Sequence, residues 1–125
     1  MSWKYFKVEE FACKHCGENL MDHKFVDKLD VLRTLYGKSL IVNSGYRCPA
    51  HNSAVSSTGG SGPHTTGRAV DFKVDRGDAV RLLEEAMGLG TFTGFGIQQK
   101  GQNRFIHLDD LPNTTGQPRP TIWTY

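Results

Sequence analysis

The stretch His64-Thr65-Thr66-Gly67-Arg68-Ala69-Val70-Asp71 places an imidazole and a carboxylate seven positions apart. A second imidazole, His107, follows far downstream in the stretch Arg-Phe-Ile-His-Leu-Asp at 104–109. Two imidazoles and one carboxylate form a ligand set for zinc, and three protein ligands leave the fourth position free for water. The three residues therefore predict a catalytic rather than a structural zinc site.

Each of these residues also has an ordinary interpretation. His64 taken alone fits a histidine on a surface loop, and His107, flanked by apolar residues, fits a buried histidine with satisfied hydrogen bonds. Asp71 is harder to explain in this way, because it lies in an apolar segment and a buried carboxylate is costly unless it is paired or bound to a metal. Gly67 allows the backbone to bend between His64 and Asp71.

The pattern of apolar residues outside this stretch predicts an α+β fold with two main helices against a small, mostly antiparallel sheet. Asp22 is expected to cap the first helix and Gly37 to end it, and Asp78 is expected to cap the second. We expect helices at 22–36 and 79–87, a helical turn at 50–55, and strands at 40–43, 68–74, 95–98, 104–108 and 121–125. The 125 residues fit one domain, 1–125, which is long enough for its own core.

Composition excludes several classes of protein. The formal net charge is only +2 and the basic residues are scattered, so we expect no nucleic-acid partner. No apolar run approaches the roughly 20 residues of a membrane span, so we expect no membrane partner either. The N-terminal segment lacks the apolar core of a signal peptide, and we therefore expect synthesis in a cytoplasm without one.

The cysteines leave three alternatives open. Cys13 and Cys16 form a Cys-x-x-Cys pair, which is half of a zinc ribbon with no second pair following it, and Cys48 stands alone. A structural metal at the pair is one alternative. A disulfide from Cys48 to one of the pair is another, and it needs an oxidising compartment. Reduced and partly buried thiols are the simplest interpretation of an odd count.

Three segments together resemble the D-alanyl-D-alanine metallopeptidase family, which includes phage endolysins and bacterial peptidoglycan peptidases. They are Ser-Gly-Tyr-Arg-Cys-Pro-Ala-His-Asn at 44–52, Ser-Gly-Pro-His-Thr-Thr-Gly-Arg-Ala-Val-Asp at 61–71 and Phe-Ile-His-Leu-Asp at 105–109. The resemblance implies the fold that this family shares with the zinc domain of hedgehog proteins. It also implies one zinc ion per chain, held by His64, Asp71 and His107, and hydrolysis of peptide bonds in peptidoglycan.

The resemblance suggests roles for further residues. Arg47 matches the family arginine after Ser-Gly-Tyr and is the candidate for a cation that balances charge on the substrate or the tetrahedral intermediate; a structural ion pair is its alternative. Many relatives carry an acidic residue three positions before the last histidine ligand, but this chain has Arg104 there. Asp109 is then the nearest candidate for the general base, and its alternative role is to orient a ligand histidine. Ser61 is a candidate for substrate contact.

These expectations lead to two competing functions. The first is a zinc peptidase, of carboxypeptidase or endopeptidase type, that acts as a monomer on peptidoglycan stem peptides. We expect such an endolysin-like protein to reach the cell wall after release from the cytoplasm, or to be part of a virion. The second is a catalytically inactive, zinc-bearing module that binds the cell wall or belongs to a virion, and the missing acidic residue at Arg104 keeps it open.

Overall fold

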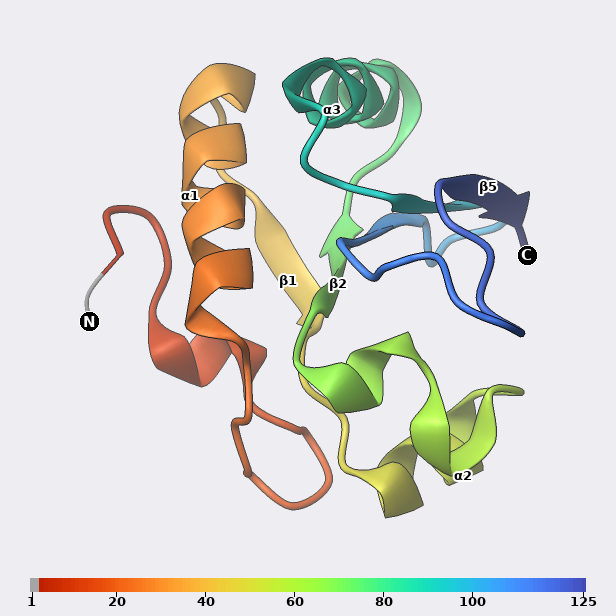
Figure 1. Cartoon of the computed structure of the whole chain (residues 1–125). Helices are drawn as coiled ribbons and strands as arrows, with labels where there is room; N and C mark the ends of the chain where they lie inside the picture. Colours follow the sequence, from red (N-terminus) through yellow and green to blue (C-terminus); the bar gives the residue numbers. More distant parts are fainter. Residues whose placement is uncertain (1–2) are drawn as a thin grey trace.

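The computed structural model describes residues 3–125 and has the predicted α+β fold. Its sheet has the strand order β1-β2-β4-β3-β5, in which β3 and β5 are parallel and every other neighbouring pair is antiparallel. The strands are β1 (Ile41–Ser44), β2 (Ala69–Lys73), β3 (Gly94–Gln98), β4 (Phe105–Asp109) and β5 (Thr121–Thr124). In Figure 1, α1 lies to the left of the sheet, α3 above it and α2 below it.

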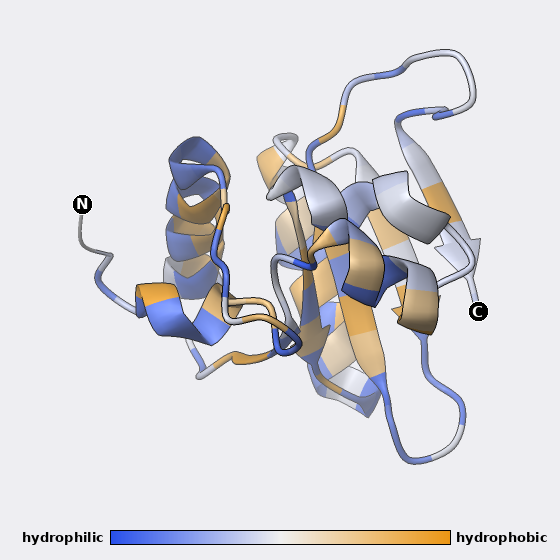
Figure 2. Cartoon of the chain, turned by 90° about the horizontal axis from the view of Figure 1, so that it is seen from below, coloured by the Kyte–Doolittle hydropathy of each residue, from blue (hydrophilic) through white to orange (hydrophobic). Residues whose placement is uncertain are grey.

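Helix α1 (His23–Tyr36) begins and ends where the sequence predicts. The carboxylate of Asp22 accepts a hydrogen bond from the backbone N–H of Phe25 at 3.0 Å, and Gly37 ends the helix in the left-handed conformation with φ 80°. Its apolar residues recur on one side and are fully buried: Phe25, Val26, Leu29 and Leu32. Figure 2 shows apolar residues along the strands in the centre of the molecule and hydrophilic residues on the outer surface of α1.

Helix α3 (Arg76–Leu89) starts earlier than predicted. Asp75 rather than Asp78 stands at the N-cap position, although its side chain makes no capping hydrogen bond, and Asp78 lies in the first turn, where its negative charge suits the helix dipole. Gly88 is inside the helix, and Gly90 ends it with φ 70°. The sequence offers two aspartates three residues apart, Asp75 and Asp78, and an aspartate at either position suits a helix cap.

The shorter elements connect these helices and strands. They are η1 (Val8–Phe11), α2 (Pro49–Val55), η2 (Gly59–Ser61) and η3 (Pro63–Thr66), of which the η elements are single 3₁₀ turns. Ile41 in the edge strand β1 is 58% exposed, because it pairs with Lys73 on the face of the sheet opposite to the core pair Val42–Phe72. None of the helices in the described part of the chain is long and apolar enough to cross a membrane.

The register of the strands separates an apolar face of the sheet from a polar one. Val70 pairs with Leu108 and Phe72 pairs with Ile106, and all four belong to the core against the helices. Because side chains alternate along a strand, the neighbouring pairs Asp71–His107 and Ala69–Asp109 point to the opposite face. The buried carboxylates of Asp71 and Asp109 and the imidazole of His107 thus lie on the face that the core does not use.

Candidate metal centre

Three elements bring His64, Asp71 and His107 together. His64 lies in the turn η3, and Asp71 and His107 are direct partners on the neighbouring strands β2 and β4. The Nε2 atom of His64 lies 3.2 Å from Oδ1 of Asp71, and Nδ1 of His107 lies 3.0 Å from the same oxygen. All three residues are buried. Gly67, which has φ 75°, provides the bend between His64 and β2.

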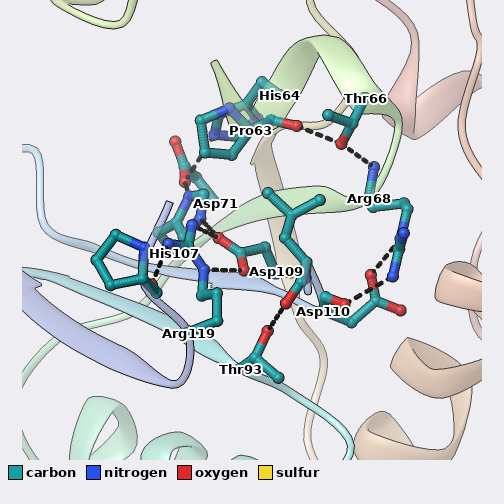
Figure 3. Close-up of polar contacts among 12 residues, drawn as sticks. Pro63, His64, Thr66, Arg68, Asp71, Thr93, His107, Asp109, Asp110 and Arg119 are labelled. Carbon is teal, nitrogen blue, oxygen red and sulfur yellow. Dashed lines mark hydrogen bonds and ion pairs between the residues drawn. The ribbon is translucent and has the colours of Figure 1, made fainter. Parts of the chain in front are cut away.

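The rear nitrogen of each imidazole is already engaged (Figure 3 shows the cluster). Nδ1 of His64 donates to the carbonyl oxygen of Gly45 at 2.8 Å, and Nε2 of His107 donates to Oδ2 of Asp109 at 2.8 Å. In a neutral imidazole the opposite nitrogen then carries a lone pair, and both lone pairs face the carboxylate of Asp71. Three electron-pair donors that converge in a buried site require a cation or added protons between them. The donor set therefore fits a zinc ion.

Asp109 is held behind His107 rather than free. Its side chain is fully buried, and the guanidinium of Arg119 clasps it from two atoms: Nε lies 2.9 Å from Oδ1 and Nη2 lies 2.8 Å from Oδ2. Such a paired, charge-assisted contact is strong and specific in geometry. The carboxylate of Asp109 is thus committed to His107 and Arg119. Asp110, the next residue, turns elsewhere and pairs with Arg68 and Lys28.

The charges of the site keep both carboxylates ionised. Burial alone would raise the pKa of Asp71, but when added protons lie on the imidazole nitrogens that face it, the charge of His64 and the hydrogen bonds from both rings hold that pKa well below its usual range. Burial also acts to raise the pKa of Asp109, and hydrogen bonds from His107 and Arg119 lower it to about 2. For His107, burial lowers the pKa, but the hydrogen bonds to Asp109 and Asp71 outweigh it and raise the pKa overall.

Arg47 lies beside the three ligands and is fixed at three of its atoms. Its Nη2 is 3.4 Å from Oδ2 of Asp71, the oxygen that does not face the imidazoles. Its Nε donates to Oγ of Ser44 at 3.0 Å, and its Nη1 donates to Oδ1 of the buried Asn52 at 3.2 Å. The guanidinium of Arg47 thus forms an ion pair with Asp71, as its structural role predicts. It is also held in a fixed position at the site, as a role in binding substrate requires.

A cleft of about 1170 Å³ opens over the cluster. His64, Asp71 and His107 line it, and so do Arg47 and Ser61, the two residues predicted to contact substrate. Within residues 3–125, Asp71 is the only acidic side chain among the residues that line this cleft. Three cationic side chains also line it: Lys14, Arg47 and Arg119.

Two glycines of β3 make room for the buried groups. A Cβ atom at Gly94 would collide with the carboxylate of Asp109, and a Cβ at Gly96 would lie 2.8 Å from the ring of Trp123 and 2.9 Å from Cβ of His107. Their alternation in Gly94-Phe95-Gly96 is a signal that sequence reasoning passed over, since a strand with a glycine at every second position leaves one face bare. Arg119 was also missed, because it lies in an irregular segment that carries no recognisable motif.

Arg104 does not reach the site. It donates from Nε to the carbonyl oxygen of Gly101 at 2.9 Å in the turn before β4, and it does not line the cleft. Phe105, the next residue, lines the cleft.

Comparison with known proteins agrees with the geometry. The family described as Peptidase M15 matches residues 4–109, and no curated protein matches the chain. The match covers most of the chain, and it includes His64, Asp71 and His107. The chain therefore belongs to the M15 family of zinc D-Ala-D-Ala peptidases, whose members are zinc-dependent metallopeptidases.

Proposed function

We propose that this chain is a zinc metallopeptidase that hydrolyses peptide bonds in the peptide stems or crossbridges of bacterial peptidoglycan. The observation that carries the proposal is the convergence of Nε2 of His64, Oδ1 of Asp71 and Nδ1 of His107, each buried, with the rear nitrogen of both imidazoles already occupied. When bound there, zinc supplies an activated water and polarises the scissile carbonyl group.

The cleft supports an extended, acidic substrate. Its volume of about 1170 Å³ exceeds the roughly 300–1,000 Å³ of a small-molecule site. Its cationic side chains suit stem peptides, which carry free carboxylates, because opposite charges attract and orient the ligand. Residues from separate parts of the chain, 55–64 and 116–125 among them, line this one cleft, and a cleft of that volume favours cleavage within a crosslink over removal of a terminal residue.

We assign Arg47 the role of binding the substrate and Asp109 the role of orienting His107. The guanidinium of Arg47 is held at the cleft wall by Ser44 and Asn52, and it can offer two parallel hydrogen bonds to a carboxylate or an oxyanion. Asp109 is fully buried, and a proton that moved to it would have to displace Arg119 or His107. Of its two predicted roles, the orientation of a ligand histidine therefore has the support of these contacts.

The inactive alternative also has a specific observation in its favour. Because Asp71 is the only acidic side chain lining the cleft within residues 3–125, no free carboxylate of the described chain stands ready as a general base. A module of this kind would bind zinc and cell wall without turnover.

One experiment separates the two functions. Purified protein is added to isolated peptidoglycan of several wall types, with and without a zinc chelator, and the loss of turbidity is followed. The soluble products are then identified by mass. We expect clearance that stops on chelation and resumes with zinc, with new free amino groups from cut crosslinks and little free D-alanine. Sedimentation of the protein with the wall, without any soluble product, would establish the binding module instead.

We propose that the protein acts at the bacterial cell wall. Such a peptidoglycan hydrolase fits an endolysin that is released to the wall, or a virion-associated lysin that acts at the start of infection. We propose that it works as a monomer, since the three ligands and Arg47 all come from one chain.

A further inference from the structure

A second cluster of ligand atoms lies away from the three residues of the peptidase site. The sulfur atoms of Cys13, Cys16 and Cys48 all lie within 4.8 Å of one another, although Cys48 is far from the other two in the sequence. All three are free thiols rather than disulfides. Cys13 and Cys48 are buried, and Cys16 is exposed. Chain folding alone thus gathers every cysteine of the protein at one point.

An imidazole lies beside the three sulfur atoms and contacts one of them. Nδ1 of His15 lies 3.5 Å from Sγ of Cys48, and the ring of His15 stacks on that of His51 at 5.5 Å between centroids. In a tetrahedral zinc site, bond lengths of about 2.3 Å to sulfur and 2.0 Å to nitrogen place neighbouring ligand atoms roughly 3.5–3.8 Å apart. The contact of His15 with Cys48 already has that spacing, and the sulfur atoms need to move by only about 1 Å or less to reach it. The ring of His15 lies outside the 4.8 Å group and has to move toward Cys13 and Cys16 to become the fourth ligand.

The backbone of the Cys-x-x-Cys segment forms a closed turn. Gly17 follows Cys16 with φ 78°, and its N–H donates to the carbonyl oxygen of Cys13 at 2.8 Å. The N–H of Cys13 donates in turn to the carbonyl of Glu18 at 2.7 Å, which closes the loop. This fixes the Cys-x-x-Cys segment with both sulfur atoms on one side.

Backbone donors also point at the sulfur atoms themselves. The N–H of Cys48 lies 3.4 Å from Sγ of Cys13, and the N–H of His51 lies 3.5 Å from Sγ of Cys48. Hydrogen bonds of this kind favour a negatively charged sulfur, and outer partners that donate to metal ligands are a regular part of metal sites. A disulfide would use two of the sulfur atoms and leave the third without a role, whereas a metal ion uses all three.

We propose that Cys13, Cys16, Cys48 and His15 bind a second zinc ion, in a closed four-ligand site of structural type. The ion ties the N-terminal turn at 13–18 to the segment that follows β1. That segment carries Arg47, next to Cys48, and Gly45, whose carbonyl oxygen holds His64. The N–H of Tyr46 donates to the carbonyl of Phe11 at 2.8 Å, so the same two segments are also joined by the backbone. The second ion thus stabilises the segment after β1, whose residues Gly45 and Arg47 contact His64 and Asp71 of the peptidase site.

The first test counts zinc per chain by elemental analysis after purification under reducing conditions. We expect two zinc ions in the wild type, one in His64→Ala and one in Cys16→Ser. Cys16 is chosen because it is exposed, so the serine should not disturb the core. His23→Ala is the matched control, since His23 lies outside both clusters and should leave the count at two.

The second test uses Co²⁺ in place of zinc, because cobalt bound to thiolates gives a strong charge-transfer absorption that nitrogen and oxygen ligands lack. We expect that absorption in His64→Ala, where only the cysteine cluster remains, and its loss in Cys16→Ser. A weakened cobalt signal in His15→Ala beside an unchanged signal in His51→Ala would support His15 as the fourth ligand. The reverse result would overturn that assignment.

One zinc per wild-type chain, with no charge-transfer absorption in His64→Ala, would overturn the proposal. So would a wild-type mass lower by two hydrogen atoms under non-reducing conditions, because it would show a disulfide within the cluster. These readouts do not depend on turnover, so failure of the second site and failure of the proposed peptidase function are distinguishable.

Discussion

The two clusters of ligand atoms differ in what holds their side chains. Asp71 and His107 lie on neighbouring strands of the sheet, and each imidazole of the first cluster is braced from behind, His64 by Gly45 and His107 by Asp109. The cysteines lie instead in a turn near the N-terminus and just before α2, and one of them is exposed. A site that must keep an open position for substrate needs rigid support from the protein, whereas a closed four-ligand site can be organised by the ion itself.

The largest effect is expected from His64→Ala, which removes one ligand of the first cluster and leaves the second intact. The loss of zinc affinity at this site should exceed the roughly 10–100-fold loss typical of changing an outer partner, and wall clearance should fall to background. Zinc content and turbidity loss are measured on the same samples. A variant that kept its clearance would show that the proposed centre does not carry the activity.

A large effect on both the site and stability is expected from Gly94→Ala, which tests the support that the sheet gives to the first cluster. The added Cβ would collide with the carboxylate of Asp109, whose neighbours Arg119 and His107 leave it no room to retreat. We expect a loss of about 1–3 kcal/mol in the free energy of unfolding, together with weaker zinc binding.

Urea unfolding of Gly94→Ala with and without a chelator measures both its free energy of unfolding and the contribution of bound zinc to it. Gly88→Ala is the matched control, because nothing lies within 4 Å of its added Cβ in the interior of α3. It should stabilise the protein by roughly 0.5–1 kcal/mol. Equal behaviour of the two alanine variants would mean that the sheet tolerates a shift of Asp109.

A smaller effect is expected from Asp109→Asn, which weakens the brace behind His107 while keeping its shape. Zinc affinity should fall about 10–100-fold, because the amide is a poorer acceptor for His107 and leaves Arg119 without a charged partner. Competition with a chelator of known affinity measures the change. Normal zinc binding with lost turnover would instead assign Asp109 as the general base.

The smallest of these effects is expected from Arg47→Lys, at the residue that stands between the two clusters. Lysine keeps the charge but loses the paired geometry, so kcat/KM on peptidoglycan fragments should fall roughly 10–100-fold while the zinc content stays the same. Arg104→Lys is the control, since Arg104 contacts only its own turn and lies outside the cleft. If both variants lost the same activity, Arg47 would have no special role.

Much of the fold follows from local pattern. The apolar spacing of 22–36 with Asp22 before it and Gly37 after it predicts α1 to within a residue, because capping and periodicity act within one turn of the chain. The predicted start of α3 was wrong by three residues, because Asp75 and Asp78 are both suitable capping residues and local pattern does not choose between them. The exposure of β1 could not be predicted, since a strand's place at the edge depends on which partner lies on its other side.

For the metal centre, the sequence by itself determined which residues have the right chemistry: two imidazoles, a carboxylate at fixed spacing and an arginine after Ser-Gly-Tyr. Only the tertiary structure decided which atom of each ligand faces the centre. That choice depends on the partners behind each ring, and Gly45, Asp109 and Arg119 come from distant parts of the chain. The same holds for the cysteines, whose spacing suggests half a site, because a contact between Cys13 and Cys48 exists only once the core has brought their segments together.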